Sequence, residues 1–239
     1  MHTPIQGEHN RLLDRLSAAD REALLRHAKK IPLIRGEVLH EAGGLIQYVY
    51  FPLSGMISLL TIVSTGEAIE TGIVGREGAA GGSIGNDGET SFGQSIVQIV
   101  GTAWRVPAAT FREQYQASTA LRTLINKYQS FILIQAQQSA ACHAMHTVEA
   151  RLCRWLLQSR DTLDSDTVDL TQEFLSHMLG VQRSTVSLSA HALQQAGLIR
   201  YSRGKVQIVN GAGLEESSCE CYRIVQHEIE KAFPKSPAV

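Results

Sequence analysis

Four cysteines and two histidines are the side chains of this sequence best suited to binding a metal or to redox chemistry. Cys142, His143 and His146 lie within five residues, and Cys219 and Cys221 lie two residues apart. On a helix, Cys142 and His146 face the same side, so a ligand pair is geometrically possible. If Cys219 and Cys221 share one helix, they diverge by about 200° and make a poor chelate. We therefore expect small buried thiols and interfacial imidazoles, with no metal or haem site.

We expect neither of two common kinds of catalytic site, a cupin-type metal centre and a hydrolase nucleophile. A cupin-type metal centre needs a pair of histidines with a nearby acid, whereas residues 31–106 contain only His40. We also expect no Gly-x-Ser-x-Gly pattern, which marks the nucleophile elbow of α/β-hydrolases. The interpretation is that the protein is not an enzyme.

Residues 170–198 have the pattern of two short helices joined by a glycine. Thr171 can cap the first helix, Gly180 ends it, and an apolar register restarts at Val181. The face left over on the second helix is rich in hydrogen-bond donors: it comprises Gln182, Arg183, Ser184, Ser187, Leu188 and His191.

This region contains basic residues and no acids. Residues 174–214 include no Asp or Glu, although the whole chain has a net charge of −1. Residues 197–208 alternate around a Ser-Arg-Gly-Lys tip, which is typical of a small β-hairpin. Phosphate contacts supply most non-specific DNA affinity, and a carboxylate on the approaching face would oppose them. The pattern therefore favours a winged helix-turn-helix that binds double-stranded DNA.

The run Leu170-Thr-Gln-Glu-Phe-Leu-Ser-His-Met-Leu-Gly-Val-Gln-Arg-Ser-Thr-Val, with Gly197-Leu-Ile-Arg-Tyr and Arg203-Gly-Lys, resembles the Crp/Fnr transcription regulators. The resemblance implies a homodimer that binds DNA and has RNA polymerase as a partner. It also implies that an N-terminal β-roll senses an effector.

The resemblance assigns DNA-contacting roles to individual residues. Arg183 matches a family arginine that starts the recognition helix, and a guanidinium pairs with guanine O6 and N7. Ser184 is expected to add a weaker base contact. Some family members carry a second base-reading arginine at the position of Leu188, so the DNA site of this protein should differ from theirs. The expected phosphate contacts are Gln182, Thr185 and Ser187 on the helix, with Arg203 and Lys205 at the wing tip.

The texture of residues 31–106, with short Val-, Ile- and Tyr-rich runs between glycine turns, indicates a β-roll or barrel. Arg35-Gly36-Glu37 and Tyr50-Phe-Pro-Leu-Ser-Gly extend the resemblance into it. Cyclic-nucleotide-binding relatives use a Gly-Glu pair and then an Arg to hold ribose and phosphate. Here Gly82 replaces the Glu, and no Arg or Lys lies between Ala79 and Val100.

The effector is therefore unidentified, and cyclic AMP is disfavoured. Flexible turns on the rim of the roll are the commoner explanation of this glycine-rich loop, although its amides can also cradle an anion. The candidate effector contacts are Gly81, Gly82, Ser83, Gln137 and Gln138. The two glutamines either transmit ligand binding to the partner subunit or set the register of the two long helices in the dimer.

A long helix is expected over residues 118–146. The resemblance makes it the dimerisation helix, with an apolar interface of Leu121, Leu124, Tyr128, Phe131 and Ile132. We expect a single amphipathic helix over residues 213–233 and a frayed tail over residues 234–239.

Length and composition bound the remaining possibilities. With 239 residues and 44% apolar composition, we expect an α+β protein: a β-roll sensor (1–117), the dimerisation helix (118–146) and a winged helix-turn-helix domain (147–239). No signal peptide or bilayer-spanning run is evident, so a cytoplasmic location without membrane contact is expected. No cofactor is assigned. The alternative is a haem, redox, small-molecule or partner-binding sensor without sequence-specific DNA reading.

Overall fold

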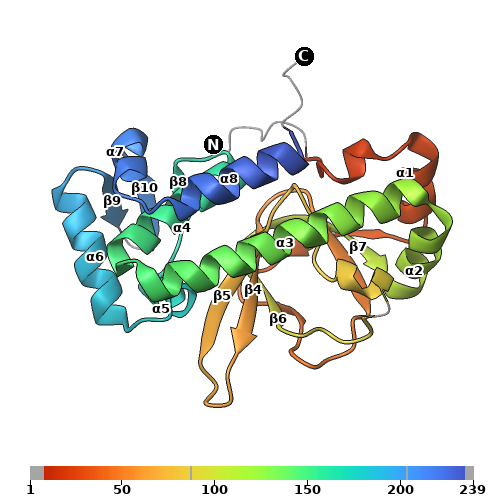
Figure 1. Ribbon diagram of the computed structural model, residues 1–239, viewed down its shortest axis with the longest axis horizontal. Coiled ribbons are helices and arrows are strands. Elements are labelled where there is room, and N and C mark those ends of the chain that lie inside the picture. The colour runs from red at the N-terminus through yellow and green to blue at the C-terminus, as the bar shows by residue number, and fades with distance from the viewer. Residues whose placement is uncertain (1–7, 87, 203, 235–239) are drawn as a thin grey trace. The chain divides into compact units, whose positions relative to one another are not determined.

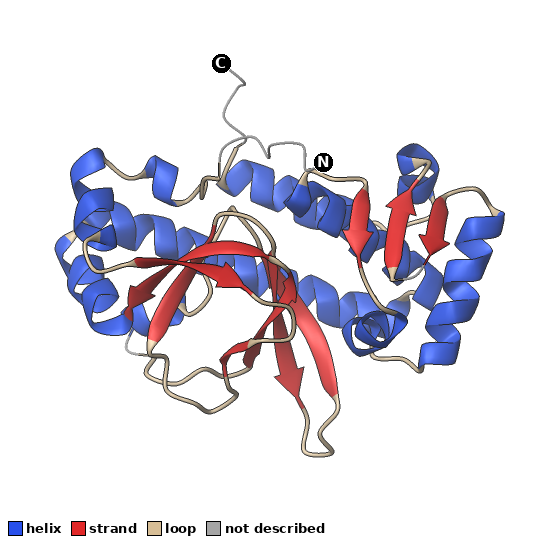
Figure 2. Ribbon diagram, turned by 180° about the vertical axis from the view of Figure 1, so that it is seen from behind, coloured by secondary structure: helices blue, strands red, loops and turns tan. Residues whose placement is uncertain are grey.

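The computed structural model describes residues 8–86, 88–202 and 204–234. It divides into two compact units, residues 1–59 with 73–130 and residues 60–72 with 131–239. Figure 1 labels the elements along the chain, and Figure 2 shows helices and strands from behind. The mixture of a strand-rich N-terminal half and a largely helical C-terminal half confirms the α+β class.

The N-terminal half carries two sheets, in the orders β1-β7-β3 and β2-β6-β4-β5. In the first, Lys29 pairs with Arg105 and Tyr48 with Pro107. The elements are η1 (Leu13–Arg15), α1 (Ala18–Leu25), β1 (Lys29–Leu33), β2 (Val38–His40), β3 (Tyr48–Pro52), β4 (Met56–Ile62), β5 (Ala68–Val74), η2 (Gly82–Asn86), β6 (Gln94–Ile99), β7 (Gly101–Pro107) and α2 (Ala108–Ala117).

The chain turns at Ser54-Gly55, and Gly55 has a φ of +78°. A Cβ at Gly55 would lie 2.6 Å from the carbonyl oxygen of Ile99, so only glycine fits the turn. The strands on either side of the turn do not pair with each other, because β3 joins β7 and β4 joins β5 and β6. The turn therefore carries the chain from one sheet of the roll to the other.

Helix α3 (Thr119–Met145) matches the long helix expected from the sequence. Ser118 lies before it and accepts a hydrogen bond from the amide of Leu121 at 3.1 Å. Leu121, Tyr128 and Phe131 are buried within the chain's own fold, at 1%, 0% and 4% exposure.

This burial corrects the predicted dimer interface, since buried side chains are not available to a partner. The heptad-like apolar stripe is the face that α3 packs on its own subunit, with Leu124 and Ile132 half-buried at its margins. The exposed face lies opposite and includes Thr123, Lys127, Ser130, Leu133, Ala141 and Ala144.

The C-terminal half is built around α4, whose Thr147 side chain caps the amide of Ala150. Trp155 on α4 is buried, and its Nε1 donates to Glu70 Oε1 at 2.8 Å. The elements are α4 (Val148–Leu163), β8 (Thr167–Asp169), α5 (Gln172–Leu179), α6 (Arg183–Gln195), β9 (Ile199–Ser202), β10 (Lys205–Ile208), α7 (Gly211–Glu216) and α8 (Cys221–Ala232).

The single C-terminal helix predicted from residue 213 is in fact two helices. α7 ends at Glu216 and α8 begins at Cys221. Cys219 lies in the turn between them, so the argument that Cys219 and Cys221 diverge on one helix does not apply. Among the residues that the structure describes, no helix is both long enough and apolar enough to cross a bilayer.

Candidate nucleic-acid interface

The two helices α5 and α6 form the predicted helix-turn-helix. Thr171 Oγ1 accepts a hydrogen bond from the amide of Phe174 at 3.3 Å and caps α5. Gly180 ends α5 in the left-handed region with a φ of +59°, and the Val181 amide donates to the Ser176 carbonyl at 3.0 Å. This C-terminal cap turns the chain sharply into α6.

Helix α6 buries Val186, Ala190 and Leu193 and leaves a polar face in solvent. Gln182, Arg183, Ser184 and Leu188 are exposed, whereas Thr185 and Ser187 are half-buried. Leu188 has 73% of its surface exposed, which is unusual for a leucine on a helix that packs against others. The structure therefore places the predicted base-reading residues on one accessible face.

Ser187 differs from its neighbours because its hydroxyl already has partners within the protein. Ser187 Oγ lies 2.9 Å from Gln172 Oε1 and 3.0 Å from the Arg183 carbonyl oxygen, and it is the donor in each case. The contact to Gln172 joins α6 to the first turn of α5. Ser187 is thus a positioning residue in the free protein as well as a predicted phosphate contact.

The start of α6 is favourable for an anion. Gln182 is the N-cap and makes no side-chain cap hydrogen bond, and the first turn contains no acid. The free amides of a helix N-terminus carry a partial positive charge, which attracts phosphate. Arg183, the first residue of α6, adds a full positive charge there.

The predicted hairpin is formed by β9 and β10, with Val206 paired to Tyr201 and Lys205 paired to Ser202. β10 also pairs with β8, which brings Lys205 opposite Asp169. Lys205 Nζ lies 3.5 Å from Asp169 Oδ1, so the wing cation is paired with a carboxylate. Asp169 precedes the acid-free run of residues 174–214, so the sequence pattern did not reveal this pair. The predicted contact Arg203 lies outside the described residues.

The proposed effector loop is closely packed. Gly81 has a φ of +84°, and a Cβ there would lie 2.8 Å from the imidazole of His40. A Cβ at Gly82 would lie 3.0 Å from Gln129 Nε2, while Ser83 is exposed. Glycine at these two positions therefore allows the loop backbone to pack closely against His40 and Gln129.

Residues 81–85, Gly-Gly-Ser-Ile-Gly, do match the Gly-x-Ser-x-Gly spacing, which corrects the expectation that no such pattern would be found. A nucleophile elbow requires a tight turn from a strand into an α-helix. Here the serine lies in the 3₁₀ helix η2, and the next element is strand β6. The Gly-x-Ser-x-Gly spacing is therefore present, but the strand-to-helix turn of a nucleophile elbow is not formed at residues 81–85.

The two glutamines proposed as effector contacts have different surroundings. Gln137 is exposed, whereas Gln138 Nε2 donates to Cys221 Sγ at 3.0 Å. Gln138 thus belongs to a group of side chains around the C-terminal cysteines. That group brings together Cys142, His146, Cys219 and Cys221, which the sequence analysis had treated separately.

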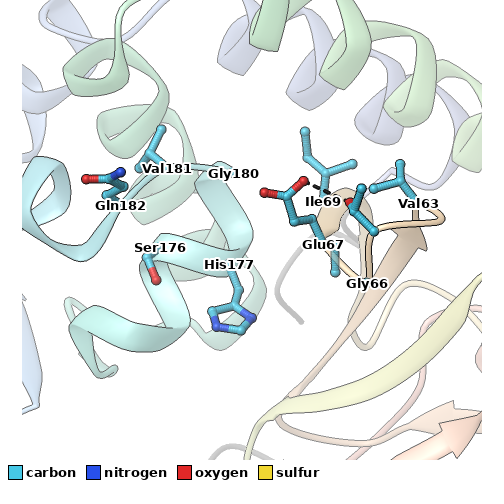
Figure 3. Close-up of a pocket in the computed structure, with 11 residues that line it drawn as sticks. Val63, Gly66, Glu67, Ile69, Ser176, His177, Gly180, Val181 and Gln182 are labelled. Atoms are coloured by element: carbon cyan, nitrogen blue, oxygen red, sulfur yellow. Dashed lines mark hydrogen bonds between the residues drawn. The ribbon is translucent and has the colours of Figure 1, made fainter.

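A groove lies beside the helix-turn-helix (Figure 3). Residues 63–69 at the tip of the β4–β5 hairpin form one wall, and Ser176, His177, Gly180, Val181 and Gln182 form the other. A Cβ at Gly180 would lie 3.4 Å from Ile69 Cδ1, so the hairpin is in contact range of the turn between α5 and α6. The N-cap of the recognition helix therefore borders this groove.

Comparison with known proteins matches this region to one domain family. Residues 150–217 match the Crp-like helix-turn-helix domain. A search of curated protein sequences returned no match.

Three solved structures illustrate the similarity of the fold. FixK2 from Bradyrhizobium japonicum is 15% identical with a TM-score of 0.70, over 80% of this chain and 98% of that chain. The c-di-GMP-responsive global regulator CLP of Xanthomonas campestris is 16% identical with a TM-score of 0.66, over 80% and 99%.

A Crp/Fnr-family transcriptional regulator of Thermus thermophilus is 21% identical with a TM-score of 0.65, over 80% of this chain and 98% of that chain. These likenesses establish the fold, and the domain match covers the helix-turn-helix and its wing. Residues 150–217 therefore carry a Crp-like helix-turn-helix domain, and the chain has the fold of these solved structures.

Proposed function

We propose that this protein is a Crp/Fnr-type transcriptional regulator that reads a specific DNA sequence as a homodimer, with α6 in the major groove. The observation that carries the proposal is the exposed face of α6, where Arg183, Ser184 and Leu188 are accessible and no acid lies in the first turn. Arg183 is the base-reading residue, since a guanidinium recognises guanine through two hydrogen bonds. Leu188 contributes an apolar contact to a thymine methyl group.

The phosphate contacts hold the duplex in register. Gln182, Thr185 and Ser187 act from the helix, with Arg203 and Lys205 from the wing. When DNA binds, Lys205 must either replace its ion pair with Asp169 by one with phosphate or interact with both groups. This exchange lowers the net gain from the wing contact.

The dimer forms through the exposed face of α3, in place of the buried stripe expected from the sequence. Leu133 is 58% exposed on this face, beside small residues such as Ala141 and Ala144 that permit close approach of a second helix. Two reading helices can then reach half-sites about 34 Å apart on one side of B-DNA.

The effector remains unassigned and is other than cyclic AMP. The support is that Gly81 and Gly82 are packed against His40 and Gln129, and that residues 79–100 contain no Arg or Lys to pair with a phosphate. Contact with RNA polymerase and a cytoplasmic location complete the proposal, as both follow from transcription regulation.

The test is selection of DNA from a random pool, followed by mobility-shift measurements of the selected site and a scrambled site at two salt concentrations. Counterion release weakens non-specific binding steeply as salt increases. A sequence-specific reader keeps its preference for the selected site at the higher salt. Equal affinity for both sites at both salt concentrations would instead indicate a sensor that acts through protein contacts.

A further inference from the structure

Four potential metal ligands converge where the end of α3 meets the last two helices. Cys142 and His146 lie one turn apart in and just beyond the last turns of α3, Cys219 lies between α7 and α8, and Cys221 starts α8. Their ligand atoms all lie within 4.8 Å of one another, and the three cysteines are buried. We propose that Cys142, His146, Cys219 and Cys221 bind a single zinc ion.

The distances suit one tetrahedral ion. Cys142 Sγ lies 3.5 Å from Cys219 Sγ, and Cys221 Sγ lies 3.5 Å from His146 Nδ1. With Zn–S of about 2.3 Å and Zn–N of about 2.0–2.1 Å, tetrahedral edges are about 3.8 Å between sulfurs and about 3.6 Å between sulfur and nitrogen. An iron–sulfur cluster distributes its four ligands over two or more irons, so ligand atoms on different irons lie further apart than the 4.8 Å that encloses all four here.

The imidazole of His146 is oriented for coordination. Its Nδ1 faces Cys221, and its Nε2 lies 3.3 Å from Glu220 Oε1. Metal-binding histidines commonly donate their second ring N–H to a carboxylate, which fixes the tautomer and strengthens the ligand. Glu220 occupies that supporting position.

Cys221 has a comparable supporting contact. Gln138 Nε2 donates to its sulfur at 3.0 Å. A hydrogen bond from an amide stabilises the thiolate form, which is the form that binds a metal.

The charges around the cluster favour an anionic centre. Zn²⁺ with three thiolates and one neutral histidine carries a net charge of −1. Arg151 and Arg154 are buried at 6% and 5% exposure, and both interact electrostatically with Cys142. Buried guanidinium groups require negative partners, and a zinc–thiolate centre would supply one.

A cysteine binds a metal as the thiolate, so Zn²⁺ binding at Cys142, Cys219 and Cys221 would displace the protons of these thiols.

Four protein ligands leave no open position, so the site is structural and not catalytic. It would join the end of α3 to α8, across 77 residues of sequence between Cys142 and Cys219. The ion would fix the C-terminal helices at the start of the reading domain, next to the Thr147 cap of α4.

The experiment is metal analysis of the full chain, purified under reducing conditions without chelator, with Co²⁺ substitution as the spectroscopic probe. We expect about one zinc ion per chain, and a Co²⁺ spectrum with sulfur-to-metal charge transfer and intense tetrahedral d–d bands. His146→Gln and Cys219→Ser should lose the ion. The matched controls His143→Gln and Cys153→Ala should retain it, since neither residue is in the cluster.

Three results would overturn the proposal: no metal and no tetrahedral Co²⁺ spectrum in the wild type, acid-labile sulfide with iron, or a Cys142–Cys219 disulfide in place of an ion. Loss of metal from the two control variants as well would also count against it. If the cysteine variant does not fold, the wild-type Co²⁺ spectrum and the His146→Gln variant still decide. DNA binding plays no part in these measurements, so the DNA proposal can fail or succeed separately.

Discussion

Lys205 Nζ and Asp169 Oδ1 form an ion pair of 3.5 Å across the β10–β8 ladder, next to the turn at the tip of the wing. Both side chains are substantially exposed, so the pair is worth only about 0.2–1 kcal/mol. The pair nevertheless places a carboxylate beside a cation that is proposed to meet phosphate.

Asp169→Asn should therefore strengthen DNA binding, because it frees Lys205 to contact phosphate. The gain should be about 0.2–1 kcal/mol at low salt, similar for cognate and scrambled sites. Lys205→Ala should weaken both sites equally, and the double variant should match Lys205→Ala. Fluorescence anisotropy with both duplexes measures this, and a gain that survives in the double variant would show that Lys205 is not involved.

Arg183→Ala should act on specificity. Loss of a two-pronged contact to guanine costs about 1–3 kcal/mol on the cognate site and relaxes the preference at one base pair. Competition binding against sites with single base changes measures the effect. Equal losses on cognate and random DNA would assign Arg183 to phosphate instead.

Leu133→Asp should convert a dimer into a monomer, because it places a charge on the exposed face of α3. Leu121→Ala is the matched control on the opposite face, where burial predicts a loss of about 2–5 kcal/mol in the free energy of unfolding without a change in oligomeric state. Light scattering and chemical denaturation distinguish the two effects. A dimer that persists in Leu133→Asp would place the interface elsewhere.

His40 predicts a pH dependence of stability. Burial lowers the pKa of its imidazole from the ordinary value of 6.5, and its nitrogens lie near Ser95 Oγ and the Tyr48 carbonyl. The unfolded chain therefore binds a proton more readily, so this contribution is present above pH 6.5 and is lost as pH falls through the folded pKa.

In chemical denaturation at about pH 7.5 and about pH 5.5, His40→Gln should lose less stability than the wild type on acidification. The difference is at most about 1.4 kcal/mol for each pH unit between the two pKa values. Identical pH dependence in both proteins would mean that His40 does not titrate in this range.

Local signals were sufficient to predict the helix-turn-helix. The Thr171 cap, the left-handed Gly180 and the apolar positions of α6 act within a few residues of one another, so their effect can be read without knowing the rest of the fold. The short apolar runs and glycine turns of the β-roll, and the apolar periodicity that predicts the length of α3, are likewise signals between residues close in sequence.

Relationships between distant residues were decided only by the tertiary structure. The apolar stripe on α3 indicates that one face of this helix is buried. Whether that face is covered by the same subunit or by a partner depends on long-range packing. The pairing of Lys205 with Asp169 depends on strand register, and the convergence of Cys142 with Cys219 depends on the break between α7 and α8. Spacing along the chain determines local geometry, whereas charge pairing and metal coordination depend on distances that only the folded chain sets.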